Sequence, residues 1–344
     1  VAQILDRTPG EVVFDPFGAS PRLAIDAALA GRAVIVAANN PVLRFLLEHT
    51  ARPPLESELR AGLSRLGSVV KDDGRLEPFL LDLYATECSA CAAHLSADFF
   101  VWDRESARLD LKGYHCPACH HADVEPASDL DRERAQAYSR RGLQHALALE
   151  QVAPAGDPDR EHAEAALAVY PARALYALVT VLNKLEQADL EPRQRTALHA
   201  LLLSTFDAGN ALWGYPEGRA RPRALTSAPR YREVNIWRQM ERSMGDWDLP
   251  ASGVELRMWT EGAPLDPGSV TIFPGPAREV MAGLARRPPD VVLTIPPRPN
   301  QAFWTLSALW AAWLWGRGEA APIRVALRRR RYDWAWHTAA LRTA

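Results

Sequence analysis

Four cysteines form two Cys-x-x-Cys pairs, and the sequence contains no further thiol. Each pair predicts a tight turn, or knuckle, that places two thiolates on one side, and 24 residues separate the pairs. Two such knuckles complete a tetrahedral sulfur shell, which is the coordination that zinc prefers. The predicted ligands are Cys88, Cys91, Cys116 and Cys119. Because four thiolates leave no coordination position for water, we expect a structural zinc ion.

Disulfides and a redox dithiol are the alternative uses of these cysteines. Disulfides need an oxidising compartment, and the N-terminus carries no charged start followed by the apolar core of a secretion signal. A redox dithiol needs a single pair on a thioredoxin-like unit, which the pattern does not indicate. Nearby histidines can replace a thiolate in such sites, or they form a polar rim: His94, His115, His120 and His121.

Polar and small residues follow two strand-like runs that lie far apart in the sequence. The first run ends in Asp15-Pro16-Phe17-Gly18-Ala19-Ser20-Pro21, and the late run ends in Thr294-Ile295-Pro296-Pro297-Arg298. Ligands of open parallel α/β sheets bind at the carboxyl ends of the strands. We therefore expect Asp15, Ser20 and Asn39 to line a cleft that faces the Pro-Pro segment. We also expect Thr294 to point to the opposite side of its strand from Ile295, because side chains alternate.

The apolar patterning predicts the elements that must position these groups. Parallel strands are expected over residues 12–17, 33–38, 270–273 and 291–295, with a helix over 21–30 between the first two. Further helices are expected over residues 132–151, 163–187, 192–212 and 303–315, with a linker over 152–159. A β-α-β opening of this kind is typical of a parallel sheet.

Together, and in this order, the segments resemble the DNA amino-methyltransferases that use S-adenosylmethionine, especially the zinc-containing adenine-specific DNA methylases. In that family the first strand ends in Asp-Pro-Phe-x-Gly-Ser-Gly, and the second ends in an acid followed by x-Asn-Pro. A distant strand of the family ends in Asp/Asn-Pro-Pro-Tyr/Phe. The counterparts here are residues 15–21, Ala38-Asn39-Asn40-Pro41 and Ile295-Pro296-Pro297-Arg298.

The resemblance implies an α/β fold with a Rossmann-like methyltransferase sheet that is interrupted by a four-cysteine zinc module and a helical region. The implied segments are 1–83 and 246–344 for the α/β domain, 84–123 for a zinc-ribbon-like insertion and 124–245 for a helical insertion. It implies S-adenosylmethionine as cofactor, bound by Asp15, Phe17, Gly18, Ser20 and Asn39. It also implies DNA as the partner and catalysis at Pro296, Pro297 and Arg298.

Several positions depart from the family pattern. Pro21 stands where a second glycine is usual, and Ala38 stands where an acid binds the ribose hydroxyls. Ile295 replaces the Asp or Asn that accepts a hydrogen bond from the target amine, and Arg298 replaces the aromatic residue that stacks on the flipped base. An isoleucine side chain has no acceptor. The sequence therefore predicts that this chain transfers no methyl group to DNA.

Arginine-rich segments near the C-terminus and around residue 230 are candidates for nucleic-acid contacts. The tetrad Arg328, Arg329, Arg330 and Arg331 precedes Tyr332 and Trp334, which combines phosphate-neutralising charge with stacking surface. A solvated helix face is the alternative interpretation, because only three of the 40 basic residues are lysine. Such an arginine bias is typical of GC-rich genomes.

Composition excludes some classes of protein. The chain has 344 residues and a formal net charge of −2, so it is not a globally basic nucleic-acid coat protein. No apolar run reaches the length of a membrane helix, so we expect a soluble, cytoplasmic protein without membrane contact. Because it begins at Val1 and stops within a helix-like pattern, we also expect a piece of a longer protein.

Two functions remain open from the sequence. The first is a DNA methyltransferase that methylates an exocyclic amine. The second is a catalytically inactive methyltransferase-like zinc protein that binds nucleic acid or a partner subunit.

Overall fold

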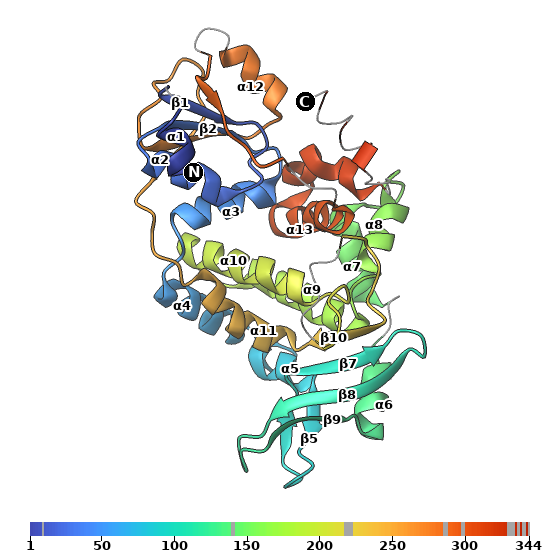
Figure 1. Ribbon diagram of the computed structural model, residues 1–344. Coiled ribbons are helices and arrows are strands. Elements are labelled where there is room, and N and C mark those ends of the chain that lie inside the picture. The colour runs from blue at the N-terminus through green and yellow to red at the C-terminus, as the bar shows by residue number, and fades with distance from the viewer. Residues whose placement is uncertain are drawn as a thin grey trace. The chain divides into compact units, whose positions relative to one another are not determined.

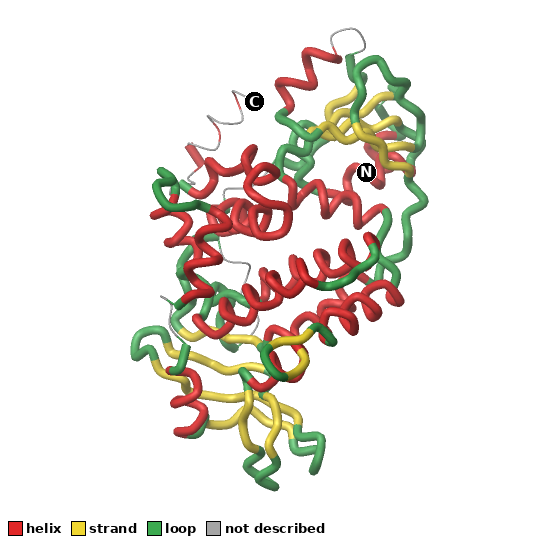
Figure 2. The backbone as a smooth tube through the Cα atoms, turned by 180° about the vertical axis from the view of Figure 1, so that it is seen from behind, coloured by secondary structure: helices red, strands yellow, loops and turns green. Residues whose placement is uncertain are grey.

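The computed structural model describes all residues except 9, 139–141, 217–222, 285–287, 297–299, 329–333, 336, 337, 339–341, 343 and 344. The described chain divides into two compact units. Unit 1 combines Val1–Pro53 with Leu249–Ala344, and unit 2 comprises Pro54–Asp248. Strands gather in two groups, one in each unit (Figure 2).

Unit 1 contains a parallel sheet, which in the described part of the chain has five strands. They are β1 (Val12–Asp15), β2 (Ala33–Ala37), β11 (Glu255–Met258), β12 (Ser269–Phe273) and β13 (Val291–Val292). Their order is β11-β12-β2-β1-β13, and all neighbours are parallel. The four predicted strands therefore lie side by side, as expected. The strand β11 was not predicted, because Glu255 and Arg257 interrupt its apolar residues.

Helices cover both faces of this sheet (Figure 1). One face packs against α2 (Pro21–Leu29) and α3 (Pro41–Ala51), and its apolar cluster includes Val13 and Val36. The other face packs against α12 (Ala277–Leu284), with Phe14 and Ile35 in the cluster. Every residue of β1 and β2 is buried, as parallel strands covered on both faces must be. The remaining helices of unit 1 are α1 (Ala2–Leu5), α13 (Gln301–Ala320) and the 3₁₀ helix η2 (Ala321–Leu327).

Strand order makes β1 the point where the direction of chain progression reverses. From β1 the chain crosses through α2 to β2 on one side, whereas β13 pairs with β1 on the other side. Connections that leave a strand in opposite directions open a crevice at its carboxyl end, which is where α/β sheets bind ligands. In unit 1 this point lies at Asp15.

Unit 2 is built around two buried helices, α9 (Ala172–Gln187) and α10 (Pro192–Ala208). α10 packs against α4 (Glu56–Gly67) and α11 (Ile236–Ser243), and α9 packs against α7 (Leu143–Val152). Its other helices are α5 (Leu76–Asp82), α6 (Asp129–Gln136), α8 (Arg160–Leu167) and the 3₁₀ helix η1 (Met244–Trp247). Within the described residues no single helix is long and apolar enough to span a membrane, although α8 and α9, bent by 111°, pass that test as a pair.

The predicted extents of two helices are wrong. The helix expected over 132–151 is two helices, α6 and α7, and residues 139–141 between them lie outside the described residues. The helix expected over 163–187 is also two, because Pro171 separates α8 from α9. Proline cannot donate the helical hydrogen bond and restricts the residue before it. Unit 2 also includes α4 and α5, which were expected in the first α/β segment.

An antiparallel sheet completes unit 2. Its strands, in the order β10-β7-β8-β9, are β10 (Arg230–Val234), β7 (Phe99–Asp103), β8 (Arg108–His115) and β9 (Ala122–Pro126). Two short hairpins pair β5 (Ala85–Glu87) with β6 (His94–Ser96) and β3 (Val70–Lys71) with β4 (Gly74–Arg75).

A buried ion pair joins this sheet to the helices of unit 2. Arg173 on α9 donates through Nε and Nη2 to the two carboxylate oxygens of Glu233 on β10, at 2.9 and 2.8 Å. The guanidinium lies 4.8 Å from the ring of Tyr84 and 4.4 Å from that of Phe100. Trp102 donates through Nε1 to Glu233 as well, at 2.5 Å. Both charged side chains are almost fully buried, with 3% and 1% exposed.

Candidate functional site

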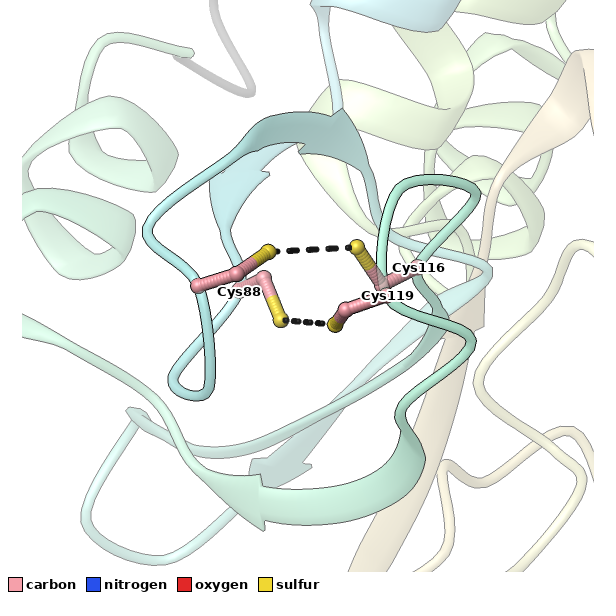
Figure 3. Close-up of side chains that lie close together, drawn as sticks. Cys88, Cys116 and Cys119 are labelled. Atoms are coloured by element: carbon pink, nitrogen blue, oxygen red, sulfur yellow. Dashed lines mark hydrogen bonds between the residues drawn. The ribbon is translucent and has the colours of Figure 1, made fainter.

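The four predicted metal ligands come together in unit 2. Cys88 and Cys91 lie in the turn of the β5–β6 hairpin, whereas Cys116 and Cys119 lie between β8 and β9 (Figure 3). All four sulfur atoms lie within 4.8 Å of one another. The Sγ–Sγ distance is 3.7 Å for Cys88–Cys119 and also for Cys91–Cys116.

These distances fit a tetrahedral metal centre. A tetrahedron with zinc–sulfur bonds of about 2.3 Å has edges of about 3.8 Å, which is close to the observed 3.7 Å. A disulfide needs about 2 Å between the two sulfur atoms, and all four cysteines are free. The site can therefore hold a metal ion such as zinc, as the spacing of the cysteines predicts.

The two knuckles share one backbone arrangement. In the first, the N–H of Cys88 donates to Ala93 O at 3.0 Å, and the N–H of Ala92 donates to Cys88 O at 2.9 Å. The equivalent bonds of the second knuckle join Cys116 with His121 at 2.8 Å and with His120 at 2.9 Å. Ala92 and His120 both have left-handed φ values, 57° and 60°. Each knuckle is thus a closed turn that points two thiols the same way.

The pKa values of two of the thiols are shifted in opposite directions. Burial raises the pKa of Cys88, but the backbone N–H groups of Cys91 and Ala90 and the Tyr114 hydroxyl lower it to about 6. The backbone N–H of His121 lowers the pKa of Cys119, but the neighbouring thiols and burial raise it to about 12. A cation at the centre favours ionisation of all four thiols, because it stabilises the four thiolates at once.

The four neighbouring histidines lie outside the cysteine cluster. His94, His115 and His120 are exposed, and His94 Nδ1 lies 3.5 Å from Glu87 Oε1. The ring of His121 packs beside that of Tyr114, with their centroids 6.1 Å apart. Among the described residues the metal-binding group contains the four cysteines and no histidine.

A second arrangement of polar groups lies at the carboxyl edge of the sheet in unit 1. Asp15, at the end of β1, has 1% of its surface exposed. Its Oδ1 accepts hydrogen bonds from the backbone N–H groups of Phe17 and Gly18, at 3.1 and 3.2 Å, and from Thr294 Oγ1 at 2.5 Å. Its Oδ2 is buried and has no hydrogen-bond partner among the described residues. A buried carboxylate oxygen that accepts no hydrogen bond marks a position where a ligand can donate one.

Thr294 is the residue of the late segment that meets Asp15, and the sequence did not predict this contact. The Pro-Pro segment was expected to face the cleft, with Thr294 pointing to the opposite side from Ile295. In the structure Ile295 is 49% exposed, and Pro296 is exposed as well. Pro297 and Arg298 lie outside the described residues. The structure therefore brings together Asp15 and the segment after β13 through the hydroxyl of Thr294.

The other residues expected to bind cofactor follow β1 and β2. Phe17 is half-buried, and Gly18 is buried with φ of 54°. A Cβ at Gly18 would lie 2.9 Å from Val36 Cγ1, so this turn requires glycine. Ser20 precedes α2 as its N-cap residue, and Asn39 Nδ2 donates to Pro322 O at 3.4 Å.

Asn40, beside Asn39, has a local role that the sequence did not predict. Its Oδ1 accepts from the N–H of Val42 at 3.0 Å and caps α3. The preceding Ala38 is buried with 1% exposed, and its methyl side chain offers no acceptor at the end of β2.

The arginine tetrad lies largely outside the described residues. Arg328 follows η2 and is exposed, whereas Arg329, Arg330 and Arg331 are not described. The sequence prediction of a nucleic-acid contact at this tetrad stays a prediction.

Comparison with known proteins found no match to this chain among protein-family models, curated proteins or solved structures. The fold and the sites define a mixed α/β protein with a parallel sheet in one unit and a four-cysteine cluster in the other.

Substitution of Asp15 by asparagine is expected to stabilise the protein at neutral pH, by the order of 1 kcal/mol. Burial raises the pKa of Asp15, and the hydrogen bonds from Thr294, Phe17 and Gly18 only partly oppose it. A carboxyl with a raised pKa contributes stability that is present below its ordinary value near 3.8 and lost as pH rises through the folded value.

Urea unfolding at pH 4 and pH 7.5 measures this effect. The Asp15→Asn protein should exceed the parent in unfolding free energy at pH 7.5, and the difference should shrink at pH 4. Asp26→Asn, on the partly exposed surface of α2, is the control. A lower stability of Asp15→Asn at pH 7.5 would contradict the prediction.

Proposed function

We propose that unit 1 is a methyltransferase-type α/β domain that binds a ligand of the S-adenosylmethionine class at Asp15 without transferring a methyl group to DNA. The observation that carries the proposal is the buried Asp15 carboxylate, whose Oδ2 has no donor within the described residues. Its place at the end of β1, where the strand order reverses, is the ligand position of open parallel sheets. In the same proposal the four cysteines hold a structural zinc ion.

Ligand chemistry follows from the groups at the crevice. Oδ1 of Asp15 is already occupied by three donors, which fix the orientation of the carboxylate. The remaining Oδ2 favours a ligand that carries an ammonium or hydroxyl donor, because a charge-assisted hydrogen bond compensates for burial of the carboxylate. The close backbone turn at Gly18 allows a ligand to approach the start of α2.

The absence of methyl transfer is supported by what surrounds the end of β13. Transfer to an exocyclic amine needs an acceptor that orients the amine. Ile295 offers none, and the Thr294 hydroxyl donates its hydrogen bond to Asp15. Ala38 leaves the end of β2 without the carboxylate that pairs with ribose hydroxyls. The domain thus retains a position for a ligand but lacks a side-chain acceptor for the target amine.

Nucleic-acid binding forms part of this proposal through the arginine-rich segments. Residues 84–126, which include the metal centre, carry seven acidic and three basic side chains, and four zinc-bound thiolates add further negative charge. Phosphates are repelled by such a surface. We therefore assign DNA to the arginine-rich segments, whose exposed described members include Arg242, Arg317 and Arg328, and a protein partner is the alternative for the zinc module.

Calorimetric titration with S-adenosylmethionine tests the ligand proposal. We expect saturable binding to the parent protein and at least a tenfold weaker affinity for Asp15→Ala, because that change removes the buried acceptor. Asp26→Ala should bind like the parent. The absence of binding at millimolar ligand would refute the proposed ligand class.

Incubation with radiolabelled S-adenosylmethionine and mixed-sequence DNA tests the catalytic part separately. We expect no label in DNA above a boiled control, and we expect Ile295→Asp alone to remain inactive because Ala38 and Pro21 are unchanged. Label incorporated by the parent protein would show that it is an active enzyme with a rewritten motif.

A further inference from the structure

The two metal-binding knuckles differ in one respect that bears on how the centre forms. The first has the sequence Cys88-Ser89-Ala90-Cys91, and the second has Cys116-Pro117-Ala118-Cys119. Their closing backbone hydrogen bonds are the same. The N–H of Ser89 donates to the hydroxyl of Tyr114 at 2.9 Å, whereas Pro117 has no N–H to donate. Tyr114 therefore ties down the first knuckle through a group that the second knuckle lacks.

Tyr114 is placed to join the two halves of the site. It lies on β8, two residues before Cys116, and is 3% exposed. Its hydroxyl donates to Glu125 Oε1 at 2.9 Å, and Glu125 lies on β9, the strand that follows the second knuckle. One hydroxyl thus contacts the first knuckle and both strands that flank the second.

A buried lysine on the same strand, β8, contacts the two residues that precede the first knuckle. Lys112 on β8 is 5% exposed, and its Nζ donates to Glu87 O at 2.7 Å and to Thr86 Oγ1 at 3.1 Å. The same Nζ lies 3.4 Å from Glu125 Oε1. Because Glu87 directly precedes Cys88, these contacts fix where the first knuckle begins.

We propose that Tyr114 is a positioning residue of the metal centre, which sets the spacing of the two knuckles when they close around a metal. The Ser89 N–H and the Tyr114 hydroxyl together hold Cys88 and Cys91 opposite the second pair of thiols. In this arrangement the four sulfur atoms lie within 4.8 Å of one another. Groups outside the ligand shell commonly change metal affinity 10- to 100-fold when removed.

Two substitutions remove this contact from opposite sides. Tyr114→Phe deletes the hydroxyl and keeps the ring. Ser89→Pro deletes the N–H and gives the first knuckle the sequence of the second, whose Pro117 follows a cysteine in the same closed turn. We expect each to raise the dissociation constant for zinc about 10- to 100-fold. The two losses should not add in the double variant, because both changes remove the bond from the Ser89 N–H to the Tyr114 hydroxyl, whereas the bond to Glu125 is lost in Tyr114→Phe alone.

Competition between the full-length protein and a metallochromic chelator, with zinc alone as the probe, measures these affinities. Cobalt titration counts the thiolates through their charge-transfer absorption, and it should report four in every variant. Ser89→Ala is a control that keeps the N–H and removes only the Ser89 hydroxyl, which lies 3.3 Å from the Tyr114 hydroxyl and is also lost in Ser89→Pro. Tyr138→Phe is a second control, which deletes a hydroxyl from a ring packed on Tyr176 with the centroids 5.4 Å apart. Both should bind zinc like the parent.

The outcomes separate positioning from general stability. If Tyr114→Phe lowers the melting temperature of the whole protein, the zinc affinity of Ser89→Pro tests the proposal, because this variant leaves the Tyr114 ring and hydroxyl in place. Parental zinc affinity in Ser89→Pro with four cobalt thiolates would overturn the proposal. Additive losses in the double variant would also overturn it, because they would show two independent effects.

Discussion

Replacing Arg173 with methionine is expected to lower the free energy of unfolding by about 3–5 kcal/mol. The change leaves the Glu233 carboxylate buried, with 1% exposed, and without the two hydrogen bonds that the guanidinium donates. A buried charge without its partner costs far more than the net contribution of the intact pair. The methionine retains most of the packing volume between Tyr84 and Phe100, so the loss measures the charge.

Urea unfolding of the full chain at neutral pH provides the measurement. The double variant Arg173→Met/Glu233→Leu should recover most of the loss, because replacing a whole buried ion pair by apolar groups is often neutral. Arg60→Met is the matched control, since Arg60 pairs with Glu56 at 2.6 Å on the exposed surface and should cost less than about 1 kcal/mol. A single Arg173→Met variant that unfolds like the control would show that the pair contributes no such energy.

Removal of the zinc ion proposed above is expected to unfold the two knuckles while the helices of unit 2 stay folded. The apolar cluster beneath the site is small, with Cys88, Tyr114 and Cys116 buried and Ala93 and Leu95 partly buried. Structural zinc contributes about 10–16 kcal/mol of apparent binding free energy in small zinc-dependent folds. So small a cluster does not replace that contribution.

Hydrogen exchange before and after chelation tests this local unfolding. The amides of Cys88 and Cys116, which close the knuckles through Ala93 O and His121 O, should lose protection. Amides in the buried α10 should keep theirs. Added zinc should restore the protected state, and added magnesium should not, because magnesium prefers oxygen ligands. Equal exchange at both knuckles with and without the metal would contradict the prediction.

The strands and the metal site were predictable because their signals are local. β2 contains only apolar residues, and β1 is apolar up to Asp15, its last residue. Strands covered on both faces require such runs. The cysteine pairs fix their own turns, so the four ligands follow from spacing alone. In contrast, β11 alternates charged and apolar residues over only four positions and carried too weak a signal.

Features that depend on distant contacts could not be predicted in this way. The affiliation of α4 with unit 2 depends on its packing against α10, which is close at Gly62, where an added Cβ would lie 3.2 Å from Gln194 O. The contact between Thr294 and Asp15 depends on where β13 ends. Its ladder stops at Val292 rather than continuing to residue 295, so Thr294 lies in the loop after the strand.

The discontinuity of unit 1 imposes an order on biosynthesis. β1 and β2 leave the ribosome early, but their neighbours β12 and β13 follow only after the whole of unit 2. Domains tend to fold as units while the chain is still being made, so unit 2 can acquire its structure first. During that interval the apolar edges of β1 and β2 lack their later partners. Chaperone binding to the nascent chain should therefore be strongest between the emergence of β2 and that of β13.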